Sequence, residues 1–132
     1  IVFNELNIDW KKELVLTEGP FDLIKATHNA TCLLGSSLPT SSCLFKQIIK
    51  NCTPVILALD PDAILKTHDI AKKLADFGVS VGLVLPDAFG DAEDVGAMNK
   101  IKFKDLVKNA VPWTSMQQLT TKIRRIRSGS LL

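Results

Sequence analysis

The sequence predicts an α/β fold with a central, mostly parallel four-stranded sheet and helices on both faces. Short apolar runs alternate with segments of helical periodicity along the 132 residues, which is the pattern of repeated β–α–β units. The run at 53–60, "TPVILALD", is almost continuously apolar, as is typical of a strand covered on both faces. The length and the hydrophobic share of 46% fit one domain with a real core.

The first half of the chain is expected to form two strands joined by a helix. The first strand lies at 13–19, "ELVLTEG", where the apolar run stops at a turn. The helix follows at 20–27, and Pro20 suits its first turn because no N–H is needed there. The second strand lies at 30–35 and is stopped by its terminal glycine.

Two helices flank the apolar run of the third strand. A Ser/Thr-rich loop and an amphipathic helix share residues 36–51, and Thr40 or Ser41 is expected to cap that helix. The helix after the third strand is expected at 63–78, with apolar side chains at helical spacing and Gly78 at its end.

The last third of the chain is expected to complete the sheet and to add two helices. A fourth strand is predicted at 79–86, followed by an acidic loop at 87–99. A short helix is predicted at 102–110 and a final amphipathic helix at 115–126.

The cysteines and histidines do not form a zinc pattern. Cys32, Cys43 and Cys52 lack CxxC spacing, so we expect reduced, mostly buried thiols in a cytosolic protein. His28 and His68 do not complete a metal set with them and are expected on helix surfaces.

Three further features bear on the context of the chain. No run approaches the roughly 20 apolar residues of a membrane span, and no signal peptide is visible. Because the chain begins with Ile1, we expect a piece of a larger protein whose function belongs to the parent. Trp10 and Trp113 could stack bases, but packing against the core is the more ordinary role for isolated aromatics.

Carboxylates follow three of the four predicted strands. The carboxyl ends of parallel strands meet at one edge of a sheet, where ligands bind in such folds. Carboxylates gathered there repel one another unless a divalent cation binds between them, and Mg²⁺ prefers such hard oxygen ligands. The acids are Glu18 after the first strand, Asp60 and Asp62 after the third, and Asp91, Glu93 and Asp94 after the fourth.

Each acid also has an ordinary interpretation. Glu18 alone would more often be a solvated strand end, and the loop acids alone a solvated loop. Asp22 could simply be an acid favoured in the first turn of a helix. Their joint placement after three strands favours a metal site.

The motifs resemble the Toprim domain, a Rossmann-like metal-binding fold shared by DnaG-type primases, topoisomerases and some nucleases. The order is Glu-Gly-x-x-Asp, a Gly-x-x-Leu step that favours primases, Asp-x-Asp, and then an acidic loop. The resemblance covers about residues 14–95 and looks bacterial or phage-like. The matching residues are Glu18, Gly19 and Asp22; Gly35 and Leu38; Asp60 and Asp62; and Asp91 and Glu93.

The resemblance implies roles for these acids. Glu18 would be the acid–base or metal-linked carboxylate, and Asp60 and Asp62 would be the main anchors of Mg²⁺ or Mn²⁺. Asp91 and Glu93 would hold a second ion. Supporting residues would be Gly19, Asp22, Gly35 and Asp94.

The implied reaction is template-directed RNA primer synthesis in DNA replication, a nucleotidyl transfer in the cytoplasm of a bacterium or phage-infected host. Its partners would be single-stranded DNA template, nucleoside triphosphates and the RNA primer, bound through the full-length parent, with a replicative helicase as a further candidate. Because primases place template recognition upstream, we expect this fragment to bind metal but to make no primer alone.

Two alternatives remain open at this point. The chain could be part of a Toprim nuclease or topoisomerase, or a non-catalytic nucleic-acid-binding module whose metal site has decayed. An upstream zinc pattern or a downstream P-loop would favour the primase.

The tail beyond residue 112 has two interpretations. Residues 1–112 are expected to form the catalytic domain, and 113–132 an amphipathic helix and the start of a linker. The helix could pack on the domain through Leu119, Ile123 and Ile126, which we favour. Alternatively, its basic residues contact phosphates; these are Lys122, Arg124, Arg125 and Arg127.

Overall fold

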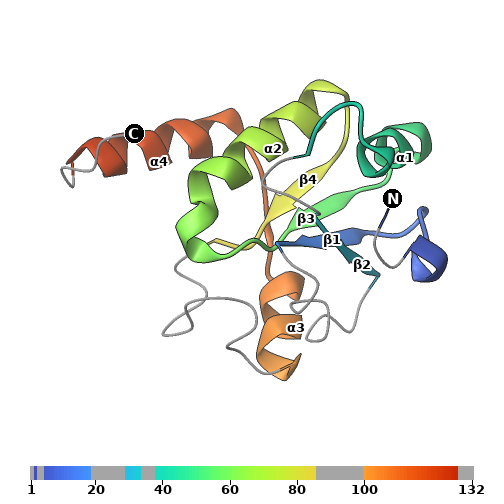
Figure 1. Cartoon of the computed structure of the whole chain (residues 1–132). Coiled ribbons are helices and arrows are strands. Elements are labelled where there is room, and N and C mark those ends of the chain that lie inside the picture. Colours follow the sequence, from blue (N-terminus) through green and yellow to red (C-terminus); the bar gives the residue numbers. More distant parts are fainter. Residues whose placement is uncertain (1, 3–4, 19–28, 34–37, 86–99, 128–132) are drawn as a thin grey trace.

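A computed structural model describes residues 2, 5–18, 29–33, 38–85 and 100–127 of the chain and shows a mixed α/β fold (Figure 1). Its five-stranded sheet has the order β2-β1-β3-β4-β5, with the first four strands parallel and β5 antiparallel to β4. The elements are η1 Glu5–Asn7, β1 Leu14–Thr17, β2 Ala30–Cys32, α1 Cys43–Asn51, β3 Val55–Leu57, η3 Pro61–Ala63, α2 Ile64–Asp76, β4 Val81–Leu83, α3 Lys100–Lys108, β5 Val111–Pro112 and α4 Ser115–Arg127.

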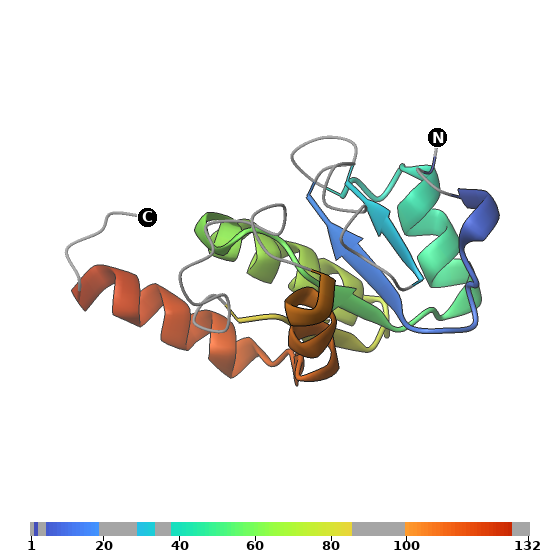
Figure 2. The ribbon, with the colours of Figure 1, turned by 90° about the horizontal axis from the view of Figure 1, so that it is seen from below.

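Helices cover both faces of the sheet, as predicted. Helices α1 and α2 lie on one face and α3 on the other (Figures 1 and 2). The larger core cluster joins strand residues such as Leu14 and Leu57 to Ile48 of α1 and Leu74 of α2. The smaller cluster, under α3, is built around Phe103. The strands are therefore buried on both sides, which explains their continuous apolar character.

The α/β class and the mostly parallel sheet are confirmed, but the sheet has one strand more than predicted. All four predicted strands form, each shorter than its apolar run. The additional strand, β5, is only two residues long and pairs with β4 at the sheet edge, where Pro112 is tolerated. The predicted helix at 20–27 and the acidic loop at 87–99 lie outside the described residues.

The helix ends follow local capping chemistry. The predicted cap of α1 was wrong by one or two positions, because Ser42 rather than Thr40 or Ser41 accepts a hydrogen bond from the Phe45 backbone N–H (3.1 Å). After α2, Gly78 has φ +85°, the left-handed conformation that ends helices. No helix within the described ranges is long and apolar enough to cross a membrane.

The expectation that the cysteines are mostly buried was wrong. All three are free thiols, but only Cys32, inside β2, is buried. Cys43 and Cys52 lie at the two ends of α1 and are exposed, because the apolar face of this short helix is formed by Leu44, Phe45 and Ile48 instead.

Candidate metal centre

Strands β1 and β3 bring their carboxyl ends side by side. Leu16 of β1 pairs with Leu57 of β3, and both strands run in the same direction. The chain continues past β3 through two buried residues, and the Ala58 N–H donates to the Leu16 carbonyl oxygen (2.9 Å). Glu18 and Asp60, which follow these strands, therefore leave the sheet at the same edge.

This edge is also where the strand order reverses. The chain goes from β1 to β2 on one side and then returns to form β3 on the other. Such a switch point is where ligands bind in open α/β sheets, because the connections leave in opposite directions and open a crevice between them.

The structure brings three of the predicted acids together at this switch point. One carboxylate oxygen from each of Glu18, Asp60 and Asp62 lies within 4.8 Å of the other two. Glu18 and Asp60 are half-buried, and Asp62 is exposed. Glu18 Oε1 is buried and has no hydrogen-bond partner within the described part of the chain, a costly state for a carboxylate oxygen without a cation.

Asp60 and Asp62 converge by a different route from the one the sequence suggested. From the sequence alone, residues 60–62 are expected to be extended, with the alternating side chains of Asp60 and Asp62 pointing the same way across Pro61. In the structure, however, η3 at Pro61–Ala63 is a 3₁₀ turn. The Ala63 N–H donates to the Asp60 carbonyl oxygen (2.9 Å) and closes this turn. The turn folds the chain back, so that both carboxylates still face Glu18.

The three acids suit a hard divalent cation. All the donors are carboxylate oxygens, the ligand type that Mg²⁺, Mn²⁺ and Ca²⁺ share. Mg²⁺ holds oxygens at 2.0–2.1 Å in an octahedron, so the ligand oxygens of one ion are about 2.9 Å apart when neighbouring and about 4.2 Å apart when opposite. The three carboxylate oxygens lie within 4.8 Å of one another, so rotations of the side chains or bridging waters would bring them onto one ion.

The remaining predicted acids and glycines of the site lie outside the described residues, so the second ion and the supporting roles stay predictions. These residues are Asp91 and Glu93, and Gly19, Asp22, Gly35 and Asp94.

Helix α4 lies against α2, but not through the side chains that the sequence favoured. The packing prediction was wrong, because Leu119, Ile123 and Ile126 are all exposed. The contact with α2 uses polar groups instead: Gln118 Nε2 donates to Asp69 Oδ1 (3.3 Å), and Thr121 Oγ1 lies 3.0 Å from His68 Nε2. Of the basic residues, Lys122, Arg124 and Arg127 are exposed and Arg125 is half-buried.

His68 is buried, which corrects the expectation that it lies on the surface. Its side chain is 1% exposed and joins α2 to two later elements. Trp113 Nε1–H donates to His68 Nδ1 (3.1 Å), so the ring proton is on Nε2, which donates to Thr121 Oγ1. Burial lowers the pKa of His68, against the opposing effect of nearby Asp69 and with a smaller contribution from Lys122.

The position of His68 in the sequence indicates that it is buried. His68 lies four residues after Ile64 and three before Ala71, so it falls on the apolar stripe of α2 rather than on the polar face. Trp10 and Trp113 both pack against the core cluster, as predicted.

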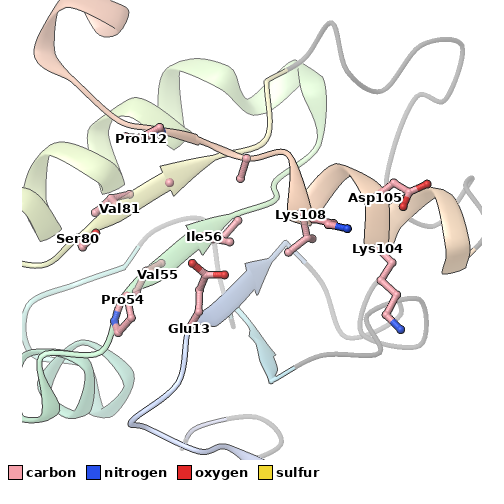
Figure 3. Close-up of a pocket in the computed structure, with 13 residues that line it drawn as sticks. Glu13, Pro54, Val55, Ile56, Ser80, Val81, Lys104, Asp105, Lys108 and Pro112 are labelled. Carbon is pink, nitrogen blue, oxygen red and sulfur yellow. The ribbon is translucent and has the colours of Figure 1, made fainter.

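A separate cavity of about 620 Å³ opens at the other end of the sheet (Figure 3). Glu13, Pro54 and Ser80, the residues just before β1, β3 and β4, line it together with Lys104 and Lys108 of α3. It is therefore distinct from the acid cluster, which lies beyond the opposite ends of β1 and β3.

The chain resembles a known protein in its fold. No protein-family model and no curated protein sequence matches the chain. Its structure is similar to a crystal structure of the Aquifex aeolicus primase that contains zinc-binding and RNA polymerase domains, with a TM-score of 0.58 and 21% sequence identity. The match covers 88% of this chain and 32% of that one, so the chain spans about a third of the length of its structural neighbour. The chain thus has a primase-like fold.

Proposed function

We propose that this chain is the metal-binding Toprim domain of a DNA primase and forms part of the site where RNA primers are made. The observation that carries the proposal is the convergence of Glu18, Asp60 and Asp62 at the switch point between β1 and β3. These are the residues that the Toprim motifs assign to metal binding. The similarity of fold to the Aquifex aeolicus primase supports the primase over the nuclease and topoisomerase alternatives.

In this proposal, residues 1–112 form the domain and 113–132 a helix that leads out of it. The structural neighbour is about three times as long as the matched part and includes a zinc-binding domain as well. We infer that other parts of the parent protein bind the single-stranded template and help to hold the nucleoside triphosphates. The chain alone would bind the ion without making primers.

The three acids would have different roles, which follow from their burial. Asp60 and Asp62 would hold Mg²⁺ or Mn²⁺, and the exposed Asp62 leaves one side of the ion open to substrate phosphate. The bound ion would stabilise the negative charge that develops on the phosphates. Glu18, with one oxygen buried, would orient toward the ion or accept the proton of the attacking 3′-hydroxyl.

The first test measures Mn²⁺ binding, using the electron paramagnetic resonance signal of the free ion. The 132-residue chain should remove the signal of free Mn²⁺, and Asp60→Asn should weaken binding at least about tenfold, because one charged ligand is lost. The matched control is Asp105→Asn, which alters an exposed carboxylate beside the distant cavity and should leave binding unchanged. Equal binding by the wild type and Asp60→Asn would refute the metal site.

The second test is activity of the parent protein. Primer synthesis on a single-stranded template should be lost in Glu18→Gln and Asp60→Asn and retained in Asp105→Asn. Metal-dependent cleavage of DNA without any RNA synthesis would instead support a Toprim nuclease. Extension of RNA by the isolated 132 residues would contradict the proposed dependence on the rest of the parent.

A further inference from the structure

Helix α4 is amphipathic, but it is turned the opposite way from an ordinary surface helix. Its apolar side chains Met116, Leu119, Ile123 and Ile126 are 67%, 52%, 42% and 63% exposed. The face that lies against α2 is polar and uses Gln118 and Thr121. A surface helix normally buries its apolar stripe on its own domain. In α4, by contrast, the apolar stripe is exposed and is not used for packing on α2.

The stripe has the spacing of a helix-pairing seam. The intervals between its four residues are three, four and three, which matches positions a and d of two consecutive heptads. Thr121, which contacts His68, then occupies position f, directly opposite the seam. The contact with α2 thus holds α4 with its seam pointing outward, and the carboxyl half of the helix extends past the sheet (Figures 1 and 2).

Two of the residues that flank the seam at positions e and g are charged, and both are basic. Lys122 precedes Ile123 and occupies position g, while Arg127 follows Ile126 and occupies position e. No acidic residue is present anywhere in Ser115–Arg127. Since e and g residues select the partner helix by charge, a helix with acidic flanks is favoured.

Three other occupants fit less well. In a parallel pair of two copies, Lys122 of one copy would face Arg127 of the other, and this like-charge contact is unfavourable. A membrane surface favours a broad apolar face, whereas this one is a narrow a/d seam without an aromatic residue. A nucleic acid would contact the basic residues but would leave the apolar seam in water.

We propose that the seam Met116–Leu119–Ile123–Ile126 is a docking surface for a partner helix with apolar a and d residues and glutamates at e and g. The partner is a protein segment, and the interaction does not depend on the metal site. The inference therefore goes beyond the proposed primer synthesis and can fail or succeed independently of it.

The test uses two synthetic peptides of about three heptads, both with Ile at a and Leu at d. One carries Glu and the other Lys at every e and g position. Fluorescence anisotropy with the 132-residue chain at roughly 0.1 M salt should show the Glu peptide binding at least about tenfold more tightly than the Lys peptide. Ile123→Asp should abolish this binding.

Two variants sharpen the result. Arg124→Ser, at position b outside the seam, is the matched control and should change affinity less than about twofold. Lys122→Glu combined with Arg127→Glu should reverse the preference, so that the Lys peptide binds more tightly. Far-ultraviolet circular dichroism and the fluorescence of Trp10 and Trp113 would check that every variant is folded.

Four outcomes would overturn the proposal. The first is equal binding of the two peptides, and the second is self-association of the chain that Ile123→Asp abolishes. The third is binding to anionic phosphatidylglycerol vesicles but not to the peptide. The fourth is binding to single-stranded DNA that displaces the peptide from the wild-type chain.

Discussion

Strand β1 has a glutamate at each end, and the two carboxylates lie in opposite surroundings. Glu13 precedes the strand and lines a cavity shared with Lys104 and Lys108 (Figure 3). Glu18 follows the strand and has Asp60 and Asp62 as neighbours. The same residue type thus flanks β1 at both ends, beside a cavity lined by two lysines and Asp105 at one end and beside further acids at the other. The direction of the strands decides which side chains come together, because the carboxyl ends of the parallel strands lie at one edge of the sheet.

The two ends of the sheet therefore differ in the charges of the side chains that gather there. At the amino ends, Lys104 and Lys108 of α3 line the same cavity as Glu13 and Asp105, so basic and acidic side chains are both present there. At the carboxyl ends, three carboxylates have oxygens within 4.8 Å of one another, so a divalent cation would relieve their mutual repulsion. A local excess of like charge, rather than the presence of an acid, distinguishes a candidate metal site from an ordinary surface.

The largest expected effect tests this difference through the linkage between metal binding and folding. At Mn²⁺ concentrations about 100-fold above the dissociation constant, the wild type should gain about 2.7 kcal/mol in free energy of unfolding. Glu13→Gln should gain the same amount, whereas Glu18→Gln should lose at least about half of the gain, as follows from binding that is at least about tenfold weaker. Thermal unfolding followed by circular dichroism, with and without Mn²⁺, measures this.

Without metal, the free energies of unfolding of the same two variants should differ in the opposite direction. In a chelator, Glu18→Gln should be more stable than the wild type by about 1 kcal/mol, because a like charge is removed from the cluster. Glu13→Gln should be unchanged or slightly less stable, because its charge lies near lysines. A gain in Mn²⁺ of the same size in Glu18→Gln as in the wild type would show that the two ends do not differ as we propose.

Much of this arrangement could be predicted from the sequence, since it follows from short-range patterns and strand direction. The apolar runs located β1 to β4, and parallel strands place Glu18 and Asp60 at the same edge of the sheet. That β1 and β3 are neighbours came only from the structure. The turn at Pro61–Ala63 was missed because the extended and 3₁₀ conformations of Asp-Pro-Asp differ little in sequence signal. Strand β5 was missed because two residues carry no periodicity.

The orientation of α4 could not be predicted, because it depends on contacts between distant parts of the chain. The apolar spacing predicts the helix but not which face docks. The face is decided by hydrogen bonds to α2, 49 and 53 residues away in sequence. His68 was expected at the surface because it is polar. In the structure, Trp113 and Thr121 hydrogen-bond to its two ring nitrogens, and this allows the side chain to be buried.

A smaller effect is expected in α1, which returns the chain from β2 to the amino end of β3. Ser42→Ala should lower the free energy of unfolding by about 1 kcal/mol, because the Phe45 N–H loses its acceptor. Ser41→Ala, one residue earlier and exposed, is the matched control and should change it by only a few tenths of a kcal/mol. Urea denaturation at constant pH measures both. Equal losses in the two variants would mean that the cap is shared rather than made by Ser42.

The smallest expected effect concerns pH and lies between the two ends, at His68 in the middle of α2. Burial lowers the pKa of His68 in the folded state, so the unfolded chain takes up a proton first as the pH falls. The free energy of unfolding should therefore decrease below about pH 6.5, the usual pKa of histidine, until the lowered pKa is reached. Asp69 opposes this shift and Lys122 adds to it, so moderate salt should change the slope only slightly.

Two variants separate His68 from the other histidine of the chain. His68→Gln should remove this decrease between pH 7.5 and about pH 5.5, a range in which few carboxylates titrate. Trp113→Phe should make the decrease shallower, because the freed Nδ1 can accept a proton in the folded state. Urea denaturation at several pH values, with metal chelated, measures both slopes. A decrease that persists in His68→Gln would assign the pH dependence to His28 and would leave His68 as a purely structural link between α2 and α4.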